Sequence, residues 1–356
     1  MILPHSPHRR PIALLPHLLG FLGLVITAGC MSRSESTVVV YSALDQEFSS
    51  PLLKAFERKA SEKEGEQQTE VVAKFDVEST KTVGLVNQII AEDDRPVCDV
   101  FWNNEILHTV RLQKLGLLKP HAWQRPPNYP SDMVAEDGTW FGFAARARVL
   151  IVNTDLLENP EDYPQSVEEL GDPKWKGLCG MARPLFGTTA THFAVLKDNI
   201  GQERTLEFLK TISNNAVVLS GNKQVATAVA SGQLAWGLTD TDDAIIEKDH
   251  GEPITIIYPD QQPDQPGTLR IPNTLAILKN APHPVAAEKI ANYLTEPNTE
   301  ERLAMGNSSQ IPLNPESDYK PRVLPNHPVR WMAVDFEAAG NDWESWTAEV
   351  QKIFPD

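Results

Sequence analysis

Apolar runs separated by short polar clusters recur along this chain, and most of the runs are apolar throughout rather than alternating with polar residues. Such runs are typical of strands that are covered on both faces. After the first run, Ser49–Pro51 supplies a helix cap and first turn, and Leu52 and Phe56 then recur on one helical face. The alternation of strands with helices predicts an α/β protein built from doubly wound, largely parallel sheets.

Polar side chains gather where the predicted strands end. The predicted strands are Thr37–Tyr41, Val71–Val77, Val97–Trp102, Val149–Asn153, Leu178–Ala182, Ala216–Leu219, Leu234–Leu238, Ile254–Tyr258 and Leu275–Leu278. The polar residues that follow them include Asp45, Asn104, Glu105, Arg183, Thr188, Thr189, Ser220, Asn222, Asp240, Asp242 and Asp243. Ligands of open α/β sheets bind at the carboxyl ends of strands, so two lobes facing each other across a cleft would bring these residues together. Capping of the next helix is the alternative explanation for any single cluster.

The length and net charge of the chain limit the folds and the binding partners that are compatible with it. A chain of 356 residues is natural for two lobes, and its formal net charge is −16 at pH 7. The overall electrostatic field of a chain this acidic repels nucleic acid and anionic lipid. We therefore expect no nucleic-acid partner.

The N-terminus has the pattern of a secretion signal. Arg9 and Arg10 precede an apolar stretch, Ile12–Ile26, which is interrupted by Pro16 and is too short to span a bilayer comfortably. The stretch leads to Ala28-Gly29-Cys30, which resembles a bacterial lipobox. We therefore expect residues 1–29 to be a lipoprotein signal peptide, Cys30 to be lipidated, and residues 30–36 to be a tether that anchors a periplasmic protein to the membrane. An ordinary cleaved signal with an incidental cysteine is the alternative.

The sharpest local group of chemical side chains is Asp240, Asp242 and Asp243, three carboxylates within four residues. They repel one another unless a cation, a helix N-terminus or solvent offsets their charge. A hard cation prefers several such oxygens, whereas N-capping alone could account for one or two of them.

A second group surrounds the predicted helix start at Gly187-Thr188-Thr189. Free backbone N–H groups and hydroxyls there, with Arg183 upstream and Asn222 on the next loop, could hold phosphate, carbonate or a carboxylate. Arg146 and Arg148 lie near the predicted crossing between lobes, where one could face the cleft or merely form a surface ion pair.

No nucleotide-binding, metalloprotease or hydrolase signature occurs in the sequence. Cys98 and Cys179 lie inside strand-like runs and are expected to be separate buried residues.

Seven short segments carry a resemblance to a known family. They are Val38–Ser42, Asp99–Trp102, Gly187–Thr189, Gly237–Asp240, Ile271–Thr274, Ala281–Pro284 and Gln310–Leu313. Together and in this order, they resemble the periplasmic ferric-iron-binding proteins of ABC importers, within the type II extracellular solute-binding superfamily. The resemblance implies a two-lobed periplasmic-binding-protein (type II) fold with a ligand cleft between doubly wound lobes. It implies an N-terminal lobe of residues 37–143 and 269–318 and a C-terminal lobe of residues 144–268 and 319–356.

The same resemblance implies the site. Iron binders of this family use adjacent tyrosines after the strand that corresponds to Leu234–Leu238, where this chain has acidic residues instead. The implied metal ligands are Asp45, Glu105, Asp240, Asp242 and Asp243. The implied ligand- or anion-binding residues are Ser42, Asn104, Arg146, Arg183, Thr188, Thr189 and Asn222.

The function that follows is that of a monomeric solute-binding lipoprotein without a cofactor or enzymatic activity. It would bind Fe(III), with a synergistic anion held by Thr188, Thr189 and Asn222, and deliver it to an ABC permease in the cytoplasmic membrane. The alternative is the same fold binding a small organic ion: an aminophosphonate, a polyamine or thiamine. Thiamine-degrading enzymes share this fold class, but they need a nucleophilic cysteine in the cleft, and Cys98 and Cys179 lie in predicted strands.

Overall fold

The computed structural model describes residues 37–61, 69–76 and 82–355. The predicted signal peptide, the predicted lipidation at Cys30 and the predicted tether lie outside these residues. Among the helices that the structure describes, none has both the length and the apolar character needed to cross a membrane.

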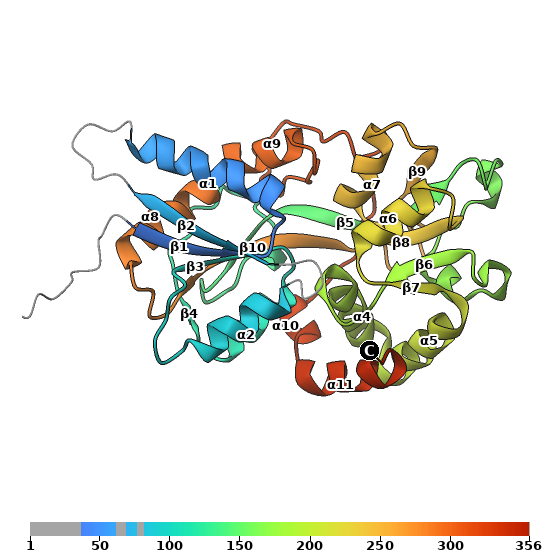
Figure 1. Ribbon diagram of the computed structural model, residues 1–356, viewed down its shortest axis with the longest axis horizontal. Coiled ribbons are helices and arrows are strands. Elements are labelled where there is room, and N and C mark those ends of the chain that lie inside the picture. The colour runs from blue at the N-terminus through green and yellow to red at the C-terminus, as the bar shows by residue number, and fades with distance from the viewer. Residues whose placement is uncertain (1–36, 62–68, 77–81, 356) are drawn as a thin grey trace, which may run out of the picture. The chain divides into compact units, whose positions relative to one another are not determined.

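The described chain alternates strands and helices, as the sequence pattern predicts (Figure 1). The strands are β1 (Thr37–Ser42), β2 (Glu70–Phe75), β3 (Val100–Asn103), β4 (Leu118–Lys119), β5 (Phe141–Asn153), β6 (Cys179–Ala182), β7 (Val217–Leu219), β8 (Trp236–Asp240), β9 (Ile254–Ile257) and β10 (Arg270–Leu278). The α-helices are α1 (Gln46–Ser61), α2 (Val83–Ala91), α3 (Leu107–Lys114), α4 (Gly187–Ile200), α5 (Gln202–Asn215), α6 (Asn222–Ala230), α7 (Thr241–Asp249), α8 (Pro284–Leu294), α9 (Pro297–Met305), α10 (Phe336–Ala339) and α11 (Trp343–Ile353). Short 3₁₀ turns occupy residues 131–133, 160–162, 167–171 and 173–175.

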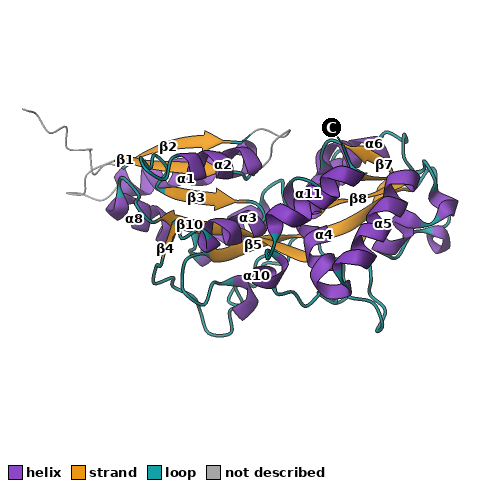
Figure 2. Ribbon diagram, turned by 90° about the horizontal axis from the view of Figure 1, so that it is seen from below, coloured by secondary structure: helices purple, strands orange, loops and turns teal. Residues whose placement is uncertain are grey.

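The strands are hydrogen-bonded in the order β2-β1-β3-β10-β5-β8-β6-β7, with β4 added on β10 and β9 added on β5. At one end β1 runs parallel to β2 and β3, and at the other β6 runs parallel to β7 and β8. These are the parallel groups that the continuous apolar runs predict. In the middle, β5 and β10 pair antiparallel with each other and with their neighbours. In each half of the sheet helices lie on both sides of the strands (Figures 1 and 2).

Strand β5 belongs to both halves of the sheet. Its first part, through Ala147, pairs with β10, and its second part, from Arg148, pairs with β8. The sequence pattern predicts only the second part, because two arginines interrupt the apolar run. Between the halves, the β5–β10 register shifts at Pro272/Asn273 and Ala144 has a φ of 41°, a left-handed conformation that is uncommon outside glycine. The irregularity falls where the chain is predicted to cross between lobes; the boundaries of the lobes themselves stay a prediction.

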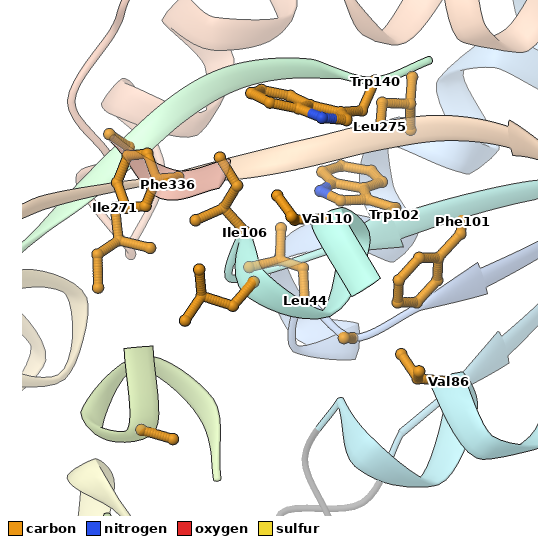
Figure 3. Packing of buried hydrophobic residues seen from close by; sticks show 14 of the residues in the cluster. Leu44, Val86, Phe101, Trp102, Ile106, Val110, Trp140, Ile271, Leu275 and Phe336 are labelled. Atoms are coloured by element: carbon orange, nitrogen blue, oxygen red, sulfur yellow. The ribbon is translucent and has the colours of Figure 1, made fainter. Parts of the chain in front are cut away.

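The core of the first half is built from buried aromatic and branched side chains (Figure 3). Trp102 of β3 is fully buried, and its ring centroid lies 5.5 Å from that of Phe143 in β5. Ile106 and Val110 bring α3 onto this core beside Phe336 of α10. These contacts fix the carboxyl end of β3, from which two predicted site residues project.

Both described cysteines are buried and unpaired, as the sequence predicts. Burial raises the pKa of the Cys179 thiol to about 12 and that of Cys98 well above its usual value. Neither is therefore a reactive thiolate.

Candidate ligand-binding site

A cavity of about 30 Å³ lies at the carboxyl ends of β6 and β8. That volume holds about two water-sized species. It is lined by Asn104, Arg146, Ala182, Arg183, Phe186, Gly187, Thr188, Ser220, Gly221, Asn222, Asp240, Asp242 and Asp243. Most of the residues predicted for the site are in this set. Asn104 follows β3 in the first half of the sheet and the others come from β5 or the second half, so the cavity draws on both halves.

Three helices begin at this cavity. The first residues of α4 and α6, Gly187 and Asn222, line it, as does Asp240, which directly precedes α7. The N-cap residues of the three helices, Phe186, Gly221 and Asp240, form no capping side-chain hydrogen bond. Their first-turn N–H groups, and the positive ends of three helix dipoles, therefore favour negative charge in and around the cavity.

Arg148 and Asp240 form a buried ion pair beside the cavity. Arg148 Nη1 lies 2.6 Å from Asp240 Oδ1, and the two side chains are 0% and 3% exposed. The Asp240 Oδ2 atom accepts from the hydroxyl of Thr188 at 2.5 Å and from Asn222 Nδ2 at 3.0 Å. Arg148 also donates to the hydroxyls of Thr188 and Thr189 and to Asn222 Oδ1, each at 3.1 Å. Thr188, Thr189 and Asn222, which are expected to hold a synergistic anion, are thus already engaged by groups of the chain itself.

Asp240 also belongs to a cluster of three carboxylates. Asp240, Asp242 and Asp243 each place one oxygen within 4.8 Å of the others, and the first two residues are buried. Their proximity in sequence becomes proximity in space because Asp240 ends β8 and the other two stand in the first turn of α7. This is a donor set that suits a hard cation.

Arg146 faces these carboxylates. Its Nη2 lies 3.5 Å from Asp242 Oδ2, and its Nε and Nη2 atoms are buried and donate no hydrogen bond within the described chain. Burial by itself would lower the pKa of Arg146, but the nearby carboxylates of Asp242, Asp240, Asp45 and Asp243 outweigh it and raise the pKa. Asp45, just before α1, therefore acts on the same guanidinium although it does not line the cavity.

Glu105, a predicted metal ligand, lies outside the cavity lining. Its carboxylate accepts from the N–H groups of Leu107 and His108 at the start of α3, from the amide of Asn103, and from the hydroxyl of Thr191 in α4. The residue is 1% exposed. These bonds use the carboxylate to cap α3 and to join it to α4, away from the cavity lining.

Of the remaining predicted residues, some line the cavity and others only support the surrounding structure. Asn104 lines the cavity and accepts from the hydroxyl of Thr82 at 3.1 Å. Arg183 lines it and donates to the backbone oxygen of Pro355 at 3.1 Å. Ser42 is buried and donates to the backbone oxygen of Leu44, so it shapes the turn after β1.

Two residues that hold the site together are not among the predicted site residues. Arg148 lies two positions after Arg146, and this spacing in a strand places both side chains on one face. Thr82 holds Asn104 from a backbone with φ 73°, which is unusual for a β-branched residue. Nothing in the local sequence signals that conformation.

Comparison with known proteins identifies the family of the chain. The family described as "Bacterial extracellular solute-binding protein" matches residues 105–338. The chain is 27% identical over 307 residues to iron uptake protein A1 of Synechocystis sp., covering 80% of this chain and 79% of that protein. It is 25% identical over 250 residues to the Fe(3+)-binding periplasmic protein of Serratia marcescens, covering 68% and 71%.

Solved structures show the same fold. Iron-bound HitA from Pseudomonas aeruginosa superposes with a TM-score of 0.74 at 21% identity, covering 89% of this chain and 99% of that one. AfuA from Actinobacillus pleuropneumoniae, with fructose-6-phosphate bound, gives 0.74 at 20% identity, covering 89% and 97%. The expected two-lobed type II periplasmic-binding-protein fold is confirmed.

Proposed function

Because the chain belongs to the bacterial extracellular solute-binding proteins, we propose that it binds Fe(III) in this cavity and delivers it to the permease of an ABC importer. The observation that carries the proposal is the meeting of three carboxylates within 4.8 Å at the cavity. Fe(III) is a hard cation, and carboxylate oxygens are ligands that suit it. The iron named for the relatives in Synechocystis and Serratia supports the same cargo.

The proposed ligands are Asp242 and Asp243 from α7, Asp240 from β8, and Asp45 and Asn104 from the first half of the chain. Asp242 and Asp243 take the place of the adjacent tyrosines that the resemblance leads one to expect. Glu105 is left out of the set because its carboxylate already accepts four hydrogen bonds.

The charge balance is compatible with a bound cation. Four carboxylates (Asp45, Asp240, Asp242 and Asp243) stand against three guanidinium groups, those of Arg146, Arg148 and Arg183, which leaves one net negative charge. A bound cation would relieve the repulsion between neighbouring carboxylates. The cavity, of about 30 Å³, has room for an ion in the described conformation.

One observation favours a second candidate. Among the described residues, no acceptor bonds the buried Nε and Nη2 atoms of Arg146, and three helices begin at the cavity without a capping bond from their N-cap residues. A small zwitterion such as an aminophosphonate could place its anion on these donors and its ammonium on Asp242 and Asp243. AfuA, which has the same fold, carries a sugar phosphate.

The location of the protein, its anchoring, its oligomeric state and its lobe boundaries are proposed from the sequence and the family together. The family works outside the cytoplasm. Anchoring through a lipid on Cys30, action as a monomer, and the lobe boundaries at 143/144, 268/269 and 318/319 are further parts of the proposal. The irregular backbone at Ala144 and at Pro272/Asn273 supports a hinge between lobes at these crossings.

Thermal unfolding of the metal-stripped protein with ferric citrate, with citrate alone, and with aminoethylphosphonate tests the cargo. A ligand at about 100 times its dissociation constant stabilises the folded state by about 2.7 kcal/mol. We expect a shift with ferric citrate only, abolished in Asp242→Asn. Asp249→Asn is the matched control, because Asp249 ends the same helix but is 43% exposed and paired with Arg322. A shift with the phosphonate and none with iron would reject iron as the cargo.

A further inference from the structure

Two of the donors that the sequence predicts for an exogenous anion bind a carboxylate of the protein itself, together with Arg148, which is not among the predicted donors. The Thr188 hydroxyl and the Asn222 amide both donate to Asp240 Oδ2, and Arg148 donates to Oδ1 at 2.6 Å. These are a hydroxyl, an amide and a guanidinium, which are the groups that bind phosphate or a free carboxylate. Asp240 thus sits where such an anion would be held.

Asp240 still has capacity to bind a cation. A carboxylate offers about four lone-pair sites, two on each oxygen. The described hydrogen bonds use two on Oδ2 and one on Oδ1, which leaves one acceptor position on Oδ1. One oxygen of Asp240 also lies within 4.8 Å of an oxygen of Asp242 and of Asp243. The carboxylate is therefore held by donors while it remains part of the acidic cluster.

Arg148 makes this arrangement hard to displace. Its guanidinium is fully buried and also donates to Thr188, Thr189 and Asn222, so it holds the same residues that would have to turn toward an incoming anion. Moving Asp240 aside would leave the charge of Arg148 in the interior without its partner, which is strongly unfavourable. An anion held by Thr188, Asn222 and Arg148 would have to replace the ion pair that Arg148 already forms with Asp240.

We propose that Asp240 is a built-in anion, which takes the place of an exogenous one and lets this protein bind its cation without any anion from solution. The inference rests on the proposed function, because it concerns the same cation. It predicts that cation binding is independent of phosphate, citrate and carbonate in the medium.

Native mass spectrometry of the full protein tests this directly. Apo-protein is loaded from ferric nitrilotriacetate, with and without added phosphate, then desalted and weighed, and its iron content is measured. We expect the wild type to retain iron equally under both conditions and to gain the mass of iron alone. A wild-type complex that carries nitrilotriacetate or phosphate, or that keeps iron only when phosphate is present, would overturn the built-in anion while leaving iron binding intact. A wild type that keeps no iron under either condition would overturn the proposed function as well.

Substitution of the carboxylate supplies the converse test. In Asp240→Ala, space opens beside Arg148, so we expect iron retention without phosphate to fall at least about tenfold and to recover when phosphate is added, with phosphate in the measured mass. Phosphate should also raise the melting temperature of Asp240→Ala but not that of the wild type. Asp240→Asn, which keeps the shape of the side chain, covers the case in which the alanine variant does not fold: its retention should fall likewise. Asp249→Asn serves as the control and should behave like the wild type. Variants that retain iron as the wild type does, without phosphate, would refute the role of Asp240.

Discussion

The buried pair of Arg148 and Asp240 should dominate the local stability of the second half of the sheet. Arg148→Met removes one charge from a contact of 2.6 Å between side chains that are 0% and 3% exposed. Two unit charges about 4 Å apart interact by about 4 kcal/mol at an effective dielectric constant of about 20. Breaking one partner of a buried pair typically costs about 3–5 kcal/mol, so we expect the free energy of unfolding to fall by about that much.

Removing both charges should cost much less than the sum of the single losses. In the double variant Arg148→Met/Asp240→Asn, no charge is left unpaired, and the Asn side chain can still bond Thr188 and Asn222. The pair should therefore show a coupling of at least about 2 kcal/mol in a double-mutant cycle. Urea unfolding followed by both tryptophan fluorescence and far-ultraviolet circular dichroism measures it, and agreement of the two probes checks that the transition is two-state.

An exposed ion pair provides the control for this cycle. Lys59 and Glu296 are 2.9 Å apart but 53% and 42% exposed, so Lys59→Met should change the unfolding free energy by less than about 1 kcal/mol. The reasoning would be refuted by a loss below about 1 kcal/mol in Arg148→Met, or by additive effects of the two substitutions.

Three further predictions follow from other residues. Glu105→Gln weakens the cap of α3, so it should lower the unfolding free energy measured in urea titrations by about 1–2 kcal/mol. The iron content of this variant after loading should stay unchanged. A loss of iron would instead show that Glu105 is a ligand. Burial raises the pKa of the Asp260 carboxyl from 3.8 to about 6, so the folded state holds a proton that the unfolded chain releases. Its contribution to stability is complete below about pH 4 and is lost as the pH rises through about 6. The difference amounts to about 3 kcal/mol, and unfolding of Asp260→Asn should lack this slope; an unchanged slope would show that another group causes it. Because Cys98 and Cys179 are buried and unpaired, a thiol reagent should label both only after unfolding, and fast labelling of the native protein would contradict their burial.

Much of the secondary structure follows from local pattern alone. Apolar runs predict β1 and β6 to within one residue of their observed ends and β8 to within two, because strands covered on both faces are mostly apolar. Strand β5 is longer than its apolar run because Arg146 and Arg148 lie inside it. Burial of two arginines requires acidic partners that the strand sequence does not contain.

One part of the candidate site likewise follows from local sequence, and another part depends on the folded structure. Asp240, Asp242 and Asp243 are neighbours along the chain, and a strand end followed by a helix start keeps them together in space, so the sequence by itself determines the acidic cluster. Glu105 resembles them in type and position, but its oxygens are used by N–H groups at the start of α3, a competition that only the folded backbone reveals.

The partner of Asp240 was decided by tertiary structure. Arg148 lies 92 positions earlier in the chain, and Thr188 lies 52 positions earlier. They meet because β5 and β8 pair antiparallel, with Arg148 opposite Asp240, while α4 begins at the end of the adjacent strand β6. Local sequence specifies which groups are charged, but the pairing of strands distant in sequence determines which charges neutralise each other and which remain for a ligand.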